Sequence, residues 1–231
     1  MKRAVDRQTS RLIELSGLVL LCLSLFLAYH LRYNHFYEVL LAGLFLVLYG
    51  LNRGHKLFPR PVRTYLLFVL MGLVIDALIG VNILHAWHYN NYRPSDYALN
   101  YLVVYPLFGS TVVQMYFYFG KRLRPHQNKF TRPCVLSDFY SYPLRTLLIL
   151  ISVALASTFI SEVPNISAES WSYSGFLLGM GSIADIPVLS LAGWPILVLI
   201  PLSAYQIFLK DNKRHSLGPR KFFPAVGATK R

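Results

Sequence analysis

Long apolar segments alternate along this chain with short polar connections. A membrane-spanning helix needs about 20 consecutive, mostly apolar residues, and six segments approach or reach that length. The second segment is the shortest, and its limits are the least sharply marked. This pattern predicts an all-α polytopic membrane protein whose single domain is a six-helix bundle. The predicted helices are Leu12–Tyr29, Tyr37–Leu51, Arg63–Leu84, Ala98–Gly120, Arg145–Ser161 and Pro187–Leu209.

Composition supports the membrane class. The chain has 231 residues, of which 55% are hydrophobic and only 14% are charged. A soluble domain usually carries about 25% charged residues. The shortage of charge therefore argues against a soluble globular protein.

Basic residues indicate how the helices cross the membrane. All Lys and Arg residues except Arg32 and Arg93 lie in the N-terminal tail, the second and fourth connections, and the C-terminal tail. Because Lys and Arg concentrate in cytoplasmic loops, we expect both termini in the cytoplasm. The tail 210–231 is basic and contains Gly and Pro, so we expect a flexible segment close to anionic lipid headgroups. The net charge of +13 is spread over these connections, which argues against nucleic acid as a partner.

Histidines gather on the opposite, non-cytoplasmic side. His85 and His88 are three residues apart, so on a helix they would share one face, and His30 and His35 lie at the same predicted level. Imidazoles on facing helices can bind haem or a metal ion. These four residues, however, sit at the ends of the apolar segments, where polar caps are common. We therefore expect no metal ion and no cofactor.

A short pattern occurs twice in the chain. An acid in or beside an apolar segment is followed by W-x-Y-polar, and then by a proline in the next apolar segment. Either the pattern reflects two duplicated helical hairpins that face each other, or it is a chance match in a chain rich in aromatic residues. The first copy comprises Asp76, "WHYN" at Trp87–Asn90 and Pro106, and the second comprises Glu162, "WSYS" at Trp171–Ser174 and Pro187.

The order of acid, W-x-aromatic-Asn and a helix near a proline resembles the lycopene cyclase domain of membrane carotenoid enzymes. It is also similar to related small hydratases and cyclases that act on isoprenoids. The resemblance covers Arg63–Leu123 and, more weakly, Arg145–Leu209. It implies a compact helical bundle, often built from two three-helix halves, that protonates a carbon–carbon double bond. The Pro-x-Glu-Glu signature of that domain is missing, since "YPLFGS" occupies Tyr105–Ser110, which argues against lycopene cyclisation itself.

The residues of the repeated pattern are suited to acid catalysis. Hydrocarbon surroundings disfavour the charged form of a carboxyl group, and a neutral acid can donate a proton to an alkene. We expect Asp76 and Glu162 to be catalytic, with Asp76 facing an apolar cavity opposite the fourth and sixth helices. Aromatic faces attract a cation and would line that cavity. The candidate substrate-binding residues are Trp87, Tyr89, Asn90, Trp171 and Tyr173.

Two other interpretations remain open at this level. Asp76 can instead be a structural residue that hydrogen-bonds across helices, for example to Asn82, Gln114 or a tyrosine. The whole protein can instead be a non-catalytic membrane subunit or a lipid-binding protein that forms homo- or hetero-oligomers, because small residues along its spans allow close helix packing.

Overall fold

The computed structural model describes residues 7–33, 35–52, 57–58, 60–123, 135–173, 181–183 and 186–209. Within this part the chain is mostly helical, as predicted. The predicted basic tail 210–231 lies outside the described residues. In chain order the elements are α1 (Arg7–Tyr29), α2 (Phe36–Leu51), α3 (Pro61–Met71), η1 (Gly72–Ile83), β1 (Trp87–Tyr89), α4 (Pro94–Leu99), η2 (Asn100–Val104), α5 (Tyr105–Leu123), α6 (Val135–Ser141), α7 (Pro143–Ala168), β2 (Trp171–Tyr173), β3 (Ser182–Ile183), β4 (Ile186–Pro187) and α9 (Val188–Leu209).

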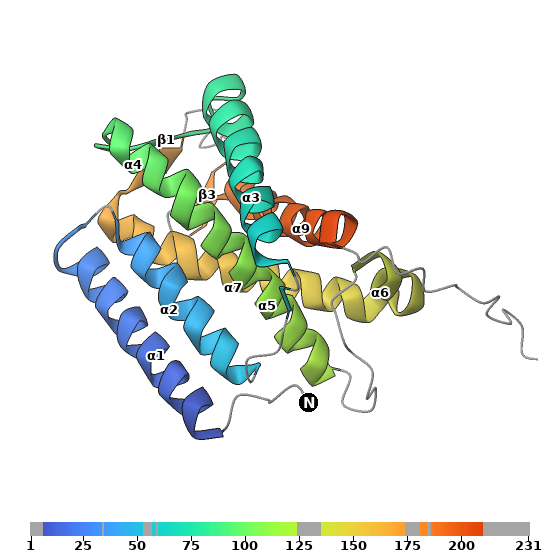
Figure 1. The fold of residues 1–231 in the computed structure, drawn as a ribbon. Helices are drawn as coiled ribbons and strands as arrows, with labels where there is room; N and C mark the ends of the chain where they lie inside the picture. Colours follow the sequence, from blue (N-terminus) through green and yellow to red (C-terminus); the bar gives the residue numbers. More distant parts are fainter. Residues whose placement is uncertain are drawn as a thin grey trace, which may run out of the picture.

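Helix α5 runs through the middle of the bundle (Figure 1) and packs against α2, α3, α7 and α9. Its inward face carries fully buried Val112, Val113 and Tyr116, which form the main core with Ile149 of α7 and Val198 of α9. Figure 1 also shows α1 on the outside of α2, with β1 and β2 at the upper end of the bundle. The central helix therefore contacts helices from both the N-terminal and the C-terminal part of the chain.

Close packing of α1 on α2 depends on small residues. Ser10, Gly17 and Ser24 recur every seven residues along α1 and are all buried. A Cβ atom at Gly17 would lie only 2.6 Å from the carbonyl oxygen of Gly43 on α2, and a Cβ atom at Gly43 would lie 2.9 Å from that of Gly17. Backbones come this close only where side chains are small. Any larger residue at Gly17 would separate the two helices.

The prediction of six membrane spans is only partly supported. Among the described residues, four helices are long and apolar enough to cross a membrane: Arg7–Tyr29, Pro61–Ile83, Pro94–Lys121 and Pro143–Ala168. The second predicted segment forms α2, which is apolar but has only 16 residues, fewer than the roughly 20 needed to span a bilayer. The sixth segment forms α9, which contains Pro195 and Pro201.

The fifth helix is longer than predicted. It continues seven residues beyond Ser161 and ends at Ala168, with Glu169 in a left-handed conformation at its C-terminus (φ 51°). The polar residues that suggested an end of the helix are buried against neighbouring elements. Ser161, for example, lies 2.9 Å from the hydroxyl oxygen of Tyr37 on α2. The sequence had placed Glu162 at the end of this helix. In the structure Glu162 lies inside the helix.

Two of these four long apolar helices contain wide π-helical turns, which the sequence did not predict. The π-helical segment η1 continues α3 over Gly72–Ile83, and η2 connects α4 to α5 over Asn100–Val104. Such turns are rare and often occur at functional sites. Asp76 of η1 and Asn100 and Val104 of η2 line the same cavity, described below.

The all-α prediction also missed some short elements. Strands β1 and β2 form one two-stranded antiparallel sheet, and β3 and β4 form another. Helix α6 lies in the fourth connection, where Tyr116 of α5 donates a hydrogen bond to Asp138 at 2.9 Å. That buried contact and the packing of Val135 into the main core attach α6 to the bundle.

Candidate functional site

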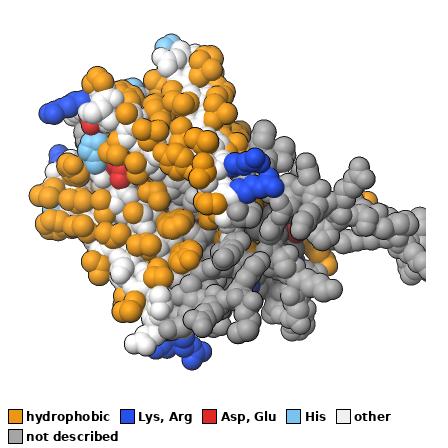
Figure 2. All heavy atoms as spheres, in the orientation of Figure 1, with side chains coloured by type: hydrophobic (Ala, Val, Ile, Leu, Met, Phe, Trp, Pro, Cys, Tyr) orange, Lys and Arg blue, Asp and Glu red, His pale blue; other side chains and the backbone are white. Residues whose placement is uncertain are grey.

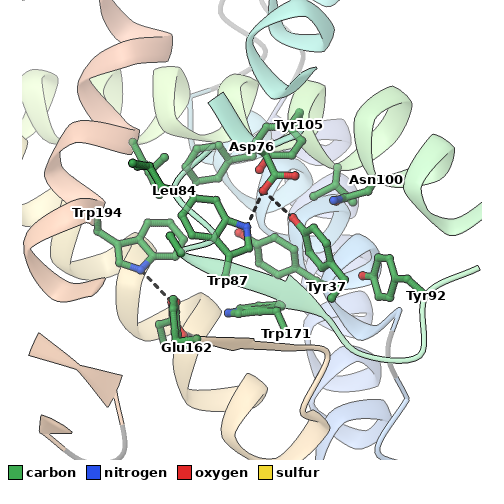
Figure 3. Close-up of a pocket in the computed structure, with 17 residues that line it drawn as sticks. Tyr37, Asp76, Leu84, Trp87, Tyr92, Asn100, Tyr105, Glu162, Trp171 and Trp194 are labelled. Atoms are coloured by element: carbon green, nitrogen blue, oxygen red, sulfur yellow. Dashed lines mark hydrogen bonds between the residues drawn. The ribbon is translucent and has the colours of Figure 1, made fainter. Parts of the chain in front are cut away.

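A cavity of about 270 Å³ opens between α5, α7, α9 and the β1–β2 sheet. Figure 3 shows aromatic side chains surrounding it, with Asp76 and Glu162 on different sides. Six of the seven residues predicted for the site line this cavity, and Asn90 does not. The aromatic lining residues are Tyr37, Trp87, Tyr89, Tyr92, Tyr105, Phe108, Trp171, Tyr173 and Trp194.

Asp76 is fully buried and is held by two residues of strand β1. The indole Nε1 of Trp87 donates to its Oδ1 atom at 2.7 Å, and the Tyr89 hydroxyl donates to the same atom at 3.0 Å (Figure 3). Its other oxygen, Oδ2, is buried and accepts no hydrogen bond of regular geometry from the described residues, although the hydroxyl groups of Tyr101 and Tyr105 also lie close to the carboxyl group. One oxygen of this carboxyl group is therefore anchored, while the other is available for a ligand or a proton.

Gly80 allows Trp87 to reach Asp76. A Cβ atom at Gly80 would lie 2.3 Å from Cζ2 and 2.4 Å from Cη2 of the Trp87 indole. The ring therefore lies directly against the backbone of η1, one π-helical turn after Asp76. Only glycine leaves room for this arrangement.

Glu162 has similar surroundings in the second copy of the pattern. Its Oε1 atom accepts a hydrogen bond from the Tyr173 hydroxyl of β2 and another, of 3.0 Å, from Nε1 of Trp194 on α9 (Figure 3). Only 2% of Glu162 is exposed. Each acid is therefore bound by one tyrosine hydroxyl and one indole N–H, although the second indole comes from α9 and not from Trp171.

The two W-x-Y strands pair directly with each other. In this antiparallel pair Trp87 lies opposite Tyr173, His88 opposite Ser172, and Tyr89 opposite Trp171. A register that is symmetric about the central pair relates the two strands by a local two-fold axis. The two copies of the sequence pattern thus meet in space, which is the arrangement that facing duplicated hairpins would produce.

Asn90 stabilises the strand pair from outside the cavity. Its side-chain nitrogen donates to the carbonyl oxygen of Glu169 at 2.7 Å and to Oγ of Ser172 at 2.6 Å. On the other side, the Asn165 side chain bonds both backbone groups of Trp171, at 3.0 and 3.2 Å. These two asparagines fix β1 and β2 relative to the end of α7.

The tyrosines beside the strands keep their protons at neutral pH. Burial raises the pKa of the Tyr89 hydroxyl well above its ordinary value of 10.0, and the nearby Asp76 carboxyl group raises it further. Burial also raises the pKa of Tyr92, as do the charges of Glu38, Asp96 and Asp76. Tyr92 stacks on Tyr89 with ring centroids 4.7 Å apart. Tyr89 therefore remains a hydrogen-bond donor to Asp76.

Sequence reasoning missed several residues of the cavity wall. Trp194 is the clearest case, because it is 7% exposed and binds Glu162. It lies within an apolar segment, away from the ends where interfacial aromatic residues are expected. That position alone could have indicated from the sequence that Trp194 belongs to the site. Tyr37, Tyr105 and Asn100 reach the cavity from α2, α5 and η2, and their sequence neighbourhood marks none of them.

The histidines do not converge on the cavity. His85 and His88 are exposed and neither lies in a helix, because η1 ends at Ile83 and His88 belongs to β1. The His35 ring lies 2.9 Å from Glu38 and 3.7 Å from Asp96. Over the described ranges, no three His, Cys, Asp or Glu side chains are grouped closely enough to hold a metal ion.

No family model, curated protein or solved structure matches this chain. The resemblance to the lycopene cyclase domain therefore stays a prediction. The function has to be argued from the chemistry of the cavity.

Proposed function

We propose that this protein is a membrane-embedded enzyme that acts on an isoprenoid or a similar lipid by acid catalysis, as a cyclase, hydratase or isomerase does. One observation carries the proposal. Asp76 is a buried carboxyl group with one oxygen anchored by Trp87 and Tyr89 and the other without a hydrogen-bond partner among the described residues, and it lines an aromatic cavity.

The outer surface supports a location in the membrane. Large apolar side chains point outward from several helices, including Val19 of α1, Leu66 of α3 and Leu155 of α7, which are 66%, 57% and 49% exposed. Figure 2 shows hydrophobic side chains over most of the described surface on one face, with Lys and Arg at its edges. A soluble monomer rarely exposes so much continuous apolar surface. This apolar surface is therefore expected to contact the hydrocarbon chains of lipids.

The orientation in the membrane is the finer part of the proposal. Arg11, Arg63, Lys121 and Arg145 belong to the start of α1, the start of α3, the end of α5 and the start of α7. These helix ends lie on one side of the bundle in Figure 1, opposite β1 and β2. By the positive-inside rule, that side is cytoplasmic, both termini are cytoplasmic, and α2 and α9 complete six crossings. The cavity then lies toward the outer half of the membrane.

The proposed chemistry begins with the protonated form of Asp76. An unpaired carboxylate in an apolar cavity is costly, and the neutral acid avoids that cost. Oδ2 gives its proton to one carbon of a double bond: a new C–H bond forms from the π electrons, and the other carbon becomes a cation. The remaining negative charge on Asp76 is stabilised by hydrogen bonds from Trp87 and Tyr89, since bonds to the charged form favour it. Surrounding aromatic faces stabilise the carbocation.

Glu162 can complete the cycle from the same cavity. As a carboxylate it removes a proton from a carbon next to the cation, or from water that adds to the cation. The C–H electrons then form a new double bond, or the water oxygen keeps the new C–O bond. Proton uptake and release balance, so no cofactor is needed. Asp76 regains its proton when Glu162 and Asp76 exchange protons with water between turnovers.

Cavity size limits the part of the substrate that enters. An engineered cavity of about 150 Å³ binds one benzene molecule, so a cavity of 270 Å³ has room for about ten carbon atoms. That is the size of two isoprene units. The cavity therefore takes the end of an isoprenoid chain, while the rest of the chain extends out of it.

Deuterium incorporation tests the proposal directly. Full-length protein in nanodiscs would be incubated in D₂O with squalene or lycopene, and with the lipid extracted from the protein itself. Wild type should add deuterium at a former alkene carbon, as detected by mass spectrometry. Asp76→Asn keeps the shape of the side chain but has no acidic proton. Its rate of deuterium incorporation should be at least about 100-fold lower than that of the wild type, which is the lower end of the contribution of general acid catalysis.

Asp96→Asn is the matched control, because Asp96 caps α4 and does not line the cavity. It should react like the wild type. Full incorporation by Asp76→Asn would refute the acid role. A second protein that co-purifies in fixed ratio, with no reaction of any isoprenoid, would favour the non-catalytic membrane subunit.

A further inference from the structure

The same cavity combines a buried acid with an unusual number of aromatic walls. Nine of its 17 lining residues are Phe, Tyr or Trp, and none is Lys, Arg or His. Among the described residues Asp76 takes part in no salt bridge, and its Oδ2 atom accepts no hydrogen bond. A negative charge at Asp76 therefore lacks a positive partner from the described part of the chain.

Aromatic rings and an unpaired carboxylate have one ligand class in common. The face of an aromatic ring attracts a cation, most strongly for Trp, and cages of such rings recognise quaternary ammonium groups. A carboxylate supplies the matching full charge. A neutral hydrocarbon would use the aromatic walls but leave the acid without a partner, whereas an organic cation would use both.

The rings are held in place before any ligand enters. The Trp87 and Trp194 rings are fixed because their N–H groups bind Asp76 and Glu162. Tyr89 is fixed by Asp76 and stacks on Tyr92. Fixed walls lose little conformational entropy on binding.

We infer that the cavity binds a small organic cation of the alkylammonium class and that Asp76 gives up its proton as the cation enters. The cation takes the place of the proton as the positive partner of the carboxylate, so the total charge in the cavity stays the same. This activity is independent of the proposed reaction. A protein that binds ammonium ions without turning over isoprenoids would refute the enzyme proposal and leave this inference intact, and turnover without cation binding would do the opposite.

Choline and 3,3-dimethyl-1-butanol form a suitable pair of probes. They have the same shape and differ in one atom, N⁺ in choline and carbon in the alcohol. The chain has three tryptophans, and all three line the cavity, so tryptophan fluorescence of purified full-length protein, excited where tyrosine does not absorb, reports on this site. Choline should bind at least about tenfold more tightly than the alcohol. Equal affinities would overturn the inference, because the cavity would then select shape and not charge.

Substitutions separate charge from ring contributions. Asp76→Asn should bring the affinity for choline close to that for the alcohol, while Asp96→Asn should behave like wild type. Trp87→Leu should weaken choline binding about thirtyfold, as expected for a desolvated cation–π contact. Trp87→Phe, which keeps an aromatic face but loses the N–H group, should recover part of that loss. An unchanged affinity in Asp76→Asn, or Phe no better than Leu at position 87, would refute the inference.

Calorimetry measures the proton. Choline titrations in phosphate and in MOPS, whose ionisation enthalpies differ and neither of which carries a net positive charge, should give heats that correspond to release of about one proton per choline. Asp76→Asn should release none. Equal heats in the two buffers with wild-type protein would show that Asp76 keeps its proton, and would overturn the exchange.

Discussion

Gly80→Ala is the sharpest single test of the Asp76–Trp87 arrangement. The added methyl group would lie 2.3 to 3.0 Å from three carbon atoms of the Trp87 indole, well inside van der Waals contact. The ring is also held by its hydrogen bond to Asp76. Either the indole moves away and this hydrogen bond breaks, or η1 shifts. Both responses strain a packed region.

Gly193→Ala is the matched control. Gly193 lies in α9 and also lines the cavity, but a Cβ atom there meets nothing within 4 Å. Replacing Gly by Ala in a helix favours folding by roughly 0.5–1 kcal/mol in both variants. The difference between them therefore isolates the overpacking at Trp87, about 1–3 kcal/mol. For a chain of this size, 1 kcal/mol moves the melting temperature by about 2–4 °C.

Thermal unfolding in detergent, followed by circular dichroism, gives the comparison. Gly80→Ala should melt about 2–12 °C below Gly193→Ala. Its tryptophan emission should also change, because Trp87 moves away from Asp76. Melting within about 1 °C of Gly193→Ala, with unchanged emission, would show that Trp87 does not lie against η1. The assigned environment of Asp76 would then be wrong.

Three further predictions concern other parts of the molecule. Asn90→Ala removes two side-chain hydrogen bonds to the segment 169–172 and should lower the free energy of unfolding by about 1–3 kcal/mol. The same melting assay measures this change, and an unchanged melting temperature would mean that these hydrogen bonds do not stabilise the strand pair. Reporter fusions after Lys213 should be cytoplasmic and those at Asp96 external, and the reverse pattern would refute the proposed orientation. Purified protein should show no Soret band, and a band that disappears in His85→Ala would identify a haem site.

Part of the site follows from the chain read alone. An acid inside an apolar segment is a candidate functional residue because a charge there is costly. The repeated order of acid, Trp and Tyr then led to six residues that line one cavity. Segment ends were also close: the first and second helices end at the predicted residues, Tyr29 and Leu51. These features are local, because hydrophobic length and residue order are properties of consecutive positions.

The tertiary structure decided which parts of the pattern meet. The cross-strand pairing of Trp87 with Tyr173 joins residues 86 positions apart, and no periodicity encodes it. Trp194 binds Glu162 only because α9 packs against α7. The π-helical turns at Asp76 occur where Gly80 packs against the Trp87 indole ring, a contact between residues that are not neighbours in the sequence. Sequence identified the acids and the rings, whereas long-range contacts determined which ring binds which acid and left Oδ2 of Asp76 without a hydrogen-bond partner among the described residues.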